Sequence, residues 1–213
     1  MKDIANLIDH TNLYPQASQA DIIKLCEEAV KYKFLSVCIN PVYVPLAVSI
    51  LKNKSPRVCT VIGFPLGAIS GEMKFAEARF LIHQGADELD MVLNIGALKE
   101  NKIEIIKNDI EKVVNAADGN CVKVIIETYL LDKEEKILAC NLVQDCGANF
   151  VKTSTGFSRG GATIEDVKLI KKTVGDHMGI KASGGIKTKE AVLSFIDAGA
   201  NRIGTSSGVE IIS

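Results

Sequence analysis

The chain has 213 residues, of which 47% are hydrophobic and 24% charged, and its formal net charge is −1 at pH 7. These values are typical of a soluble globular protein, and we expect residues 1–213 to form a single domain. The near-zero charge gives no electrostatic basis for binding nucleic acid or a membrane surface, and no apolar run reaches the roughly 20 residues that span a bilayer.

The chain begins with a strand-like segment, NLIDHTNL at 6–13, and from about residue 18 it alternates between two patterns. Short runs rich in valine and isoleucine are typical of strands buried on both faces. They lie at 36–40, 57–63, 88–94, 121–127, 149–152, 179–183 and 201–206. Amphipathic helical segments lie between them, such as 97–118, where Ile106, Ile110 and Val113 share an apolar face.

Local signals support the helices. Three segments have the spacing of a capping box, which marks the start of a helix: Ser18-x-x-Asp21, Asp132-x-x-Glu135 and Thr163-x-x-Asp166. Glycines stand where three helices should end: Gly85, Gly147 and Gly199.

About eight alternating strand and helix units in one short domain predict a TIM (β/α)₈ barrel. The alternative is a doubly wound sheet, which needs a glycine-rich nucleotide-binding turn after an early strand. Neither GxGxxG nor GxxxxGK[ST] occurs there. In a barrel, the catalytic groups lie at the carboxyl ends of the strands.

Two lysines end consecutive predicted strands and precede small residues: Lys152 in FVKTSTG and Lys181 in IKASGG. Two ammonium groups held close together in a partly dry pocket disfavour each other's charge. A neutral lysine amine can attack an aldehyde to form an imine, which accepts electrons when the adjacent carbon–carbon bond breaks. Asp90, inside the run ELDMVL, offers a carboxylate for the proton transfers. The three residues predict a metal-free aldolase.

Other interpretations of the charged residues stay open. A lysine near a strand end is often a surface residue with a buried stem, and we interpret Lys2, Lys123 and the DKEEK run at 132–136 in this way. Asp90 could be a structural carboxylate held by backbone donors or an ion pair. Glu127 is expected to anchor a loop. The alternative functions are a sugar-phosphate isomerase or epimerase, and a non-catalytic sugar-phosphate binder.

The histidines and cysteines predict neither a metal nor another cofactor. His10, His83 and His177 have no metal-ligand spacing. The six cysteines form no CxxC pair, which favours reduced thiols in a cytoplasmic protein. The amino-terminal segment MKDIANLIDH also lacks the pattern of a signal peptide.

Glycines and serines follow the last three strands. Barrel enzymes often bind phosphate with the loops after strands 7 and 8 and the amino end of a short extra helix, and GTSSGVEII looks like the start of such a helix. We therefore expect phosphate contacts from Gly184, Gly185, Ser206 and Ser207. The pair at 160–161 could equally bind phosphate or only form a turn.

These motifs together resemble the deoxyribose-phosphate aldolases of the bacterial type. The matching segments span nearly the whole chain: DHTNL (9–13), ELDMVLNIGAL (88–98), VKTSTGF (151–157), KASGGI (181–186) and RIGTSSG (202–208). The resemblance implies a class I aldolase on a TIM barrel that needs no cofactor. It implies reversible cleavage of 2-deoxy-D-ribose 5-phosphate to acetaldehyde and D-glyceraldehyde 3-phosphate, by a homo-oligomer of two or four copies.

The resemblance also implies roles for single residues. Lys152 matches the Schiff-base lysine, Asp90 the carboxylate of the proton relay and Lys181 the second lysine. The implied substrate contacts are Asp9 and Thr11 near the hydroxyl groups, Cys38 at the pocket wall, and Thr155 and Gly156 after the Schiff-base lysine. The chain departs from the family pattern in two places. Lys187 stands where many relatives have an arginine, and we do not expect after Ser213 the longer tail with a tyrosine that some relatives have.

Overall fold

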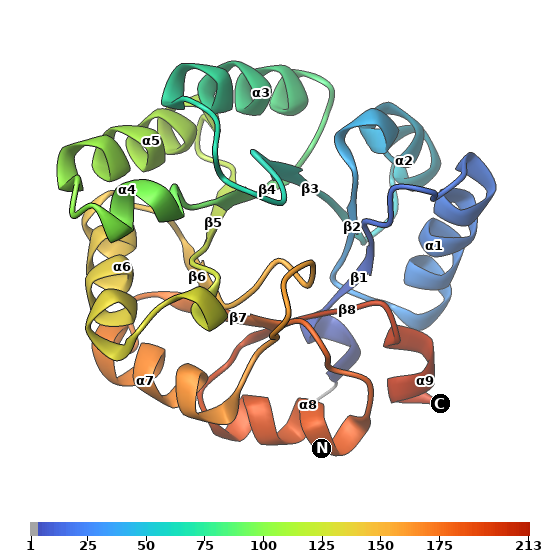
Figure 1. Cartoon of the computed structure of the whole chain (residues 1–213). Helices are drawn as coiled ribbons and strands as arrows, with labels where there is room; N and C mark the ends of the chain where they lie inside the picture. Colours follow the sequence, from blue (N-terminus) through green and yellow to red (C-terminus); the bar gives the residue numbers. More distant parts are fainter. Residues whose placement is uncertain (1–3) are drawn as a thin grey trace.

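The computed structural model describes residues 4–213, so Lys2 lies outside the described residues. Eight strands form one closed barrel in sequence order (Figure 1). They are β1 (Ile8–Asn12), β2 (Ser36–Ile39), β3 (Arg57–Ile62), β4 (Glu88–Val92), β5 (Cys121–Ile125), β6 (Phe150–Lys152), β7 (Gly179–Ser183) and β8 (Arg202–Thr205). All neighbouring strands run parallel, and β8 returns to β1. This confirms the predicted TIM barrel and excludes the doubly wound sheet.

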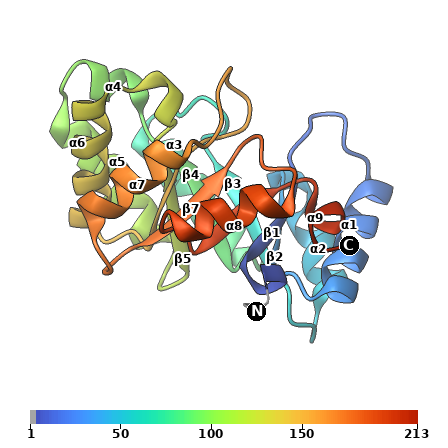
Figure 2. The same cartoon turned by 90° about the horizontal axis from the view of Figure 1, so that it is seen from below.

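Helices surround the strands in a ring (Figure 1), and the view turned by 90° shows α7 and α8 crossing the outside of the barrel (Figure 2). The α-helices are α1 (Gln19–Tyr32), α2 (Val44–Leu51), α3 (Gly71–His83), α4 (Ile95–Lys99), α5 (Ile103–Ala116), α6 (Lys133–Asp145), α7 (Ile164–Val174), α8 (Lys189–Asp197) and α9 (Gly208–Ile212). Short 3₁₀ helices occupy Ile4–Leu7, Pro41–Tyr43 and Thr128–Leu130. No helix in the described part of the chain is long and apolar enough to cross a membrane.

The helix starts follow the predicted capping chemistry with one exception. Ser18 and Asp132 each form a complete capping box at the start of α1 and α6. Thr163 accepts a hydrogen bond from the backbone of Asp166 but receives none back. The Asp166 carboxylate is instead 2.6 Å from the Lys136 ammonium of α6. An ion pair between neighbouring helices has replaced half of the predicted box.

Several predicted boundaries differ from those of the structure by one or two residues, and two segments differ because of a turn or a short helix. The segment 97–118 is not one helix, because the chain turns between α4 and α5 at Asn101, which has φ 53°. The segment 6–13 begins with part of a 3₁₀ helix, so β1 starts only at Ile8. The three glycines predicted to end helices all have positive φ, the region that favours glycine.

Side-chain alternation along the strands separates an apolar layer from a charged interior. On β4, Leu89 and Met91 belong to the main hydrophobic core. Glu88 and Asp90 are fully buried and form ion pairs with residues of other strands. Their carboxylates therefore lie inside the barrel, below its mouth.

Candidate active site

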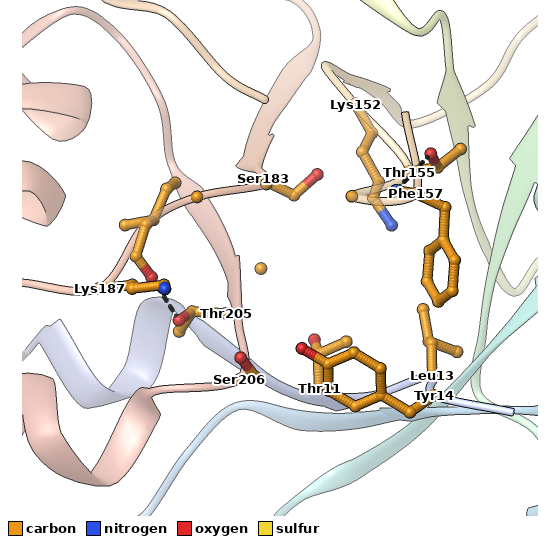
Figure 3. Close-up of a pocket in the computed structure, with 15 residues that line it drawn as sticks. Thr11, Leu13, Tyr14, Lys152, Thr155, Phe157, Ser183, Lys187, Thr205 and Ser206 are labelled. Carbon is orange, nitrogen blue, oxygen red and sulfur yellow. Dashed lines mark hydrogen bonds between the residues drawn. The ribbon is translucent and has the colours of Figure 1, made fainter. Parts of the chain in front are cut away.

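A pocket opens at the carboxyl ends of the strands, where barrel enzymes place their functional groups. The Lys152 side chain, at the end of β6, points into it (Figure 3). Thr11 and Tyr14 lie across from this lysine, and Lys187 and Ser206 line a further side (Figure 3). The pocket thus joins an amine at one side to hydroxyl and cationic groups at others.

Lys152 and Lys181 lie side by side beneath this opening. They are register partners on β6 and β7, and each Nζ is 2.7 Å from the same oxygen, Oδ2 of Asp90. Lys181 also lies 2.5 Å from Asp9 Oδ2. The side chain of Lys152 is 3% exposed and that of Lys181 is fully buried. The structure therefore brings the three predicted catalytic residues together. Of these three, Lys152 is the one that lines the pocket.

Asp90 is the centre of this arrangement. Its second oxygen, Oδ1, accepts hydrogen bonds from Lys123 Nζ at 2.9 Å and Cys59 Sγ at 3.2 Å. Burial alone would raise the pKa of Asp90, but Lys123, Lys152 and Lys181 outweigh burial and hold that pKa well below its usual range. Asp90 is thus an ionised carboxylate fixed by ion pairs.

The sequence predicted that each lysine would lower the pKa of the other, but the pKa of Lys181 is raised. Burial favours its neutral form, but the carboxylates of Asp9 and Asp90 outweigh burial and raise the pKa of Lys181 above the ordinary value. The reason is geometric: the ammonium lies between two carboxylates. Lys181 is therefore charged in the resting site, beside Lys152.

Lys123 is not the surface residue that the sequence suggested. Its side chain is fully buried, 2.5 Å from Glu88 Oε2 and 2.9 Å from Asp90 Oδ1. The flanking Val122 and Val124 belong to the outer hydrophobic core. Since side chains alternate along a strand, the lysine between them must face the barrel interior. This alternation was the signal that could have identified it.

Some of the predicted substrate-contacting residues line the pocket, and others do not. Those that line the pocket are Thr11, Thr155, Gly156, Gly184, Gly185 and Ser206. Asp9 and Cys38 are fully buried and do not line it. Ser207 does not line it either, and its backbone N–H donates to Thr205 Oγ1 at 3.0 Å. The short helix predicted after β8 is α9.

Two further predictions concern residues in the loops beside the pocket. Glu127 accepts hydrogen bonds from the hydroxyls of Thr155 and Ser158, which confirms it as a loop anchor. Gly160 and Gly161 do not line the pocket. A Cβ at either would lie within 2.3 Å of Tyr129 or Gly184, so these glycines allow close packing of the loops.

The described residues contain two groups of possible metal ligands. Asp90 with Cys38 and Cys59, and Asp9 with Cys59 and Glu88, bring ligand atoms within 4.8 Å of one another. The carboxylates in both groups are already paired with lysine or arginine cations, which would repel a metal ion. All six cysteines are free thiols.

A closed barrel with a buried lysine amine at its mouth, beside a carboxylate that a second lysine shares, is suited to imine chemistry. This fold and site define an aldolase-type barrel. The family model of the DeoC/LacD family aldolases matches residues 4–212. The chain belongs to this family.

Individual relatives agree over almost the whole chain. The deoxyribose-phosphate aldolase of Thermococcus gammatolerans is 59% identical, over 99% of this chain and 95% of the relative. That of Streptococcus sanguinis is 55% identical, over 96% of this chain and 93% of the relative. A tetrameric deoxyribose phosphate aldolase from Aeropyrum pernix superposes with a TM-score of 0.92 at 34% identity, covering 98% of this chain and 89% of that structure.

Proposed function

We propose that this protein reversibly cleaves 2-deoxy-D-ribose 5-phosphate to acetaldehyde and D-glyceraldehyde 3-phosphate through an imine on Lys152. The observation that carries the proposal is the position of the Lys152 amine, which reaches the pocket while hydrogen-bonded to Asp90. A buried carboxylate beside a reactive amine can accept and return protons. The activity named for the close relatives supports this substrate.

The chemistry requires no cofactor. The neutral amine of Lys152 adds to the aldehyde carbon of the open-chain sugar, and loss of water gives a protonated imine. The bond between C2 and C3 then breaks, and its electron pair moves into the imine to form an enamine. The C3 hydroxyl loses its proton as C3 becomes the aldehyde of glyceraldehyde 3-phosphate. Protonation of the enamine at C2 and hydrolysis of the imine release acetaldehyde and restore the amine.

Asp90 and Lys181 are the proposed proton relay. Asp90 contacts both ammonium groups through one oxygen, so a proton can pass from either lysine through the carboxylate or an adjacent water. Asp9 holds Lys181 in place from the other side. In this account Asp9 and Cys38 act from below the pocket, and Thr11 and Thr155 contact the sugar hydroxyls directly.

The phosphate is proposed to lie at the side of the pocket formed by Gly184, Gly185 and Ser206. Gly184 and Gly185 have φ values of 90° and 80°, a conformation that exposes backbone N–H groups to an anion. Lys187 lines the same pocket and supplies a positive charge. Ser207 does not line the pocket. It is the N-cap residue of α9, and its proposed role is to place the amino end of this helix beside the phosphate.

We further propose that the protein acts as a homo-oligomer of two or four copies in the cytoplasm, with no nucleic-acid or membrane partner. The tetrameric relative from Aeropyrum pernix supports the assembly. On α3, Met73 and Phe80 are 60% and 62% exposed, an apolar surface of the kind that subunits cover.

The test is a product assay on the purified protein with 2-deoxyribose 5-phosphate. We expect acetaldehyde and glyceraldehyde 3-phosphate in equal amounts, and no product with Lys152→Met. Conversion to an isomeric sugar phosphate without acetaldehyde would instead identify an isomerase. Binding of the sugar without turnover would identify a binder.

A further inference from the structure

Seven buried charged side chains form one continuous network inside the barrel, and it extends well below the pocket. They are Asp9, Glu88, Asp90, Lys123, Lys152, Lys181 and Arg202. At its lower end, Arg202 Nη1 lies 2.9 Å from Glu88 Oε2 and 2.7 Å from Asp9 Oδ1. Glu88 in turn contacts Lys123 at 2.5 Å. No member of the network has a side chain more than 5% exposed.

The charges of this network do not cancel when every group is ionised. Three carboxylates face four cations. Three of those cations, Lys123, Lys181 and Arg202, each contact two carboxylates. Lys152 contacts only Asp90 in this network and also lines the pocket. The network is therefore neutral when Lys152 alone has lost its proton.

We propose that Glu88 and Arg202 are positioning residues that hold the charge balance of the barrel interior and thereby set the pH range in which Lys152 forms its imine. Neither residue lines the pocket, so each acts through others: Glu88 through Lys123 and Asp90, and Arg202 through Asp9 and Lys181. Charges buried in a low-dielectric interior act over longer distances than charges in water. This inference rests on the proposed imine at Lys152.

The other titratable or charged residues near Lys152 are the same in the wild-type protein and in variants of Glu88 or Arg202. They are Cys38 of β2, Cys59 of β3, Asp90 of β4, Lys123 of β5, Lys181 of β7, Glu127 in the loop after β5 and Lys187 after β7. Arg57 also contacts Glu88, at 2.9 Å, but its side chain is 53% exposed. Solvent screens its charge, which makes it the matched control.

The experiment measures the rate of borohydride trapping of acetaldehyde on Lys152 as a function of pH, with the modified peptide identified by mass spectrometry. Glu88→Gln removes a negative charge and should move the midpoint of the profile to lower pH. Arg202→Met removes a positive charge and should move it to higher pH. A unit charge about 10 Å away at an effective dielectric constant of about 20 gives a shift of about one pH unit.

The double variant Glu88→Gln/Arg202→Met restores neutrality, so its midpoint should return to the wild-type value. Arg202→Lys, which keeps the charge, and Arg57→Gln should leave the midpoint in place. Folding is checked by circular dichroism. If Arg202→Met does not fold, Arg202→Gln replaces it, because glutamine keeps a donor for the two carboxylates.

A purely structural role would lower the amount of folded protein without moving the two single variants in opposite directions. Equal midpoints in all variants, or a double variant that shifts further than either single one, would overturn the proposal. Absence of trapping at Lys152 in the wild-type protein would instead refute the proposed function on which it rests.

Discussion

Lys152 and Lys181 donate to the same oxygen of Asp90, each across 2.7 Å. The carboxylate therefore lies between the two ammonium groups and links them. Asp9 holds Lys181 from the other side at 2.5 Å, so Lys181 is charged in the resting site. Of the two lysines, Lys152 is the one whose amine reaches the pocket. The two lysines are adjacent in the barrel but chemically unequal.

Two replacements of Lys181 distinguish the effect of its positive charge from its role as a proton donor. Lys181→Leu removes a cation that shares Asp90 with Lys152, so the carboxylate should hold the Lys152 ammonium more strongly. We therefore expect imine formation on Lys152 to be slow at pH 7 and faster at high pH. Lys181→Arg keeps the charge but does not readily release a proton, so the imine should form while turnover falls by about 10²–10⁴-fold. Trapping rates and kcat measured on both variants provide the test. If borohydride traps the imine at the same rate in Lys181→Leu and in the wild-type protein at pH 7, Lys181 does not influence Lys152.

Gly185→Val tests the proposed phosphate site. Its φ of 80° and its place in the pocket lining mean that a valine shifts backbone donors away from the anion. The KM for 2-deoxyribose 5-phosphate should rise about 10- to 100-fold, the effect of losing one hydrogen bond to a charged group, with little change for free deoxyribose.

Gly119→Val is the matched control for this change. Gly119 has φ 84°, no atom within 4 Å of an added Cβ, and a position before β5, away from the pocket. It should reproduce the backbone strain without the rise in KM. Equal losses for both sugars in Gly185→Val would indicate a folding defect instead of lost phosphate binding.

Lys123→Met should destabilise the barrel, because it leaves Glu88 and Asp90 buried with one cation fewer. Breaking a buried ion pair typically costs about 3–5 kcal/mol, so the free energy of unfolding in urea should fall by that amount. Lys133→Met, at an exposed position of α6, should change it by less than about 0.5 kcal/mol. Similar stabilities for the two variants would contradict the structural role of Lys123.

His10 should make the stability of the protein depend on pH just below neutrality. Burial lowers the pKa of His10 below 6.5 despite the nearby Glu28 carboxylate at 2.8 Å. The unfolded chain therefore binds a proton more readily than the folded protein, so stability is complete above pH 6.5 and is lost as the pH falls through the lowered value. His10→Gln should flatten this dependence between pH 7 and about 5.5. The exposed His177 supplies the control: if His177→Gln flattens the curve equally, burial of His10 is not the cause.

The fold and the central trio could be predicted because they depend on periodic patterns. Parallel strands place their ends at one edge, so Lys152 and Lys181 had to meet. The burial of Lys123 was not predicted, because a lone lysine is usually a surface residue. Its position between the core residues Val122 and Val124 decides instead which side of the strand it faces. The turn at Asn101 and the hydrogen bond from Ser207 to Thr205 depend on local backbone geometry, which no hydrophobic pattern records.

The most direct test of the account is to identify the lysine that binds the aldehyde. The wild-type protein is treated with acetaldehyde and borohydride, and its peptides are mapped by mass spectrometry. We expect one stable ethyl group, on Lys152, with activity lost in proportion to the label. Labelling confined to Lys181 or Lys123, or full inactivation without any label, would contradict it.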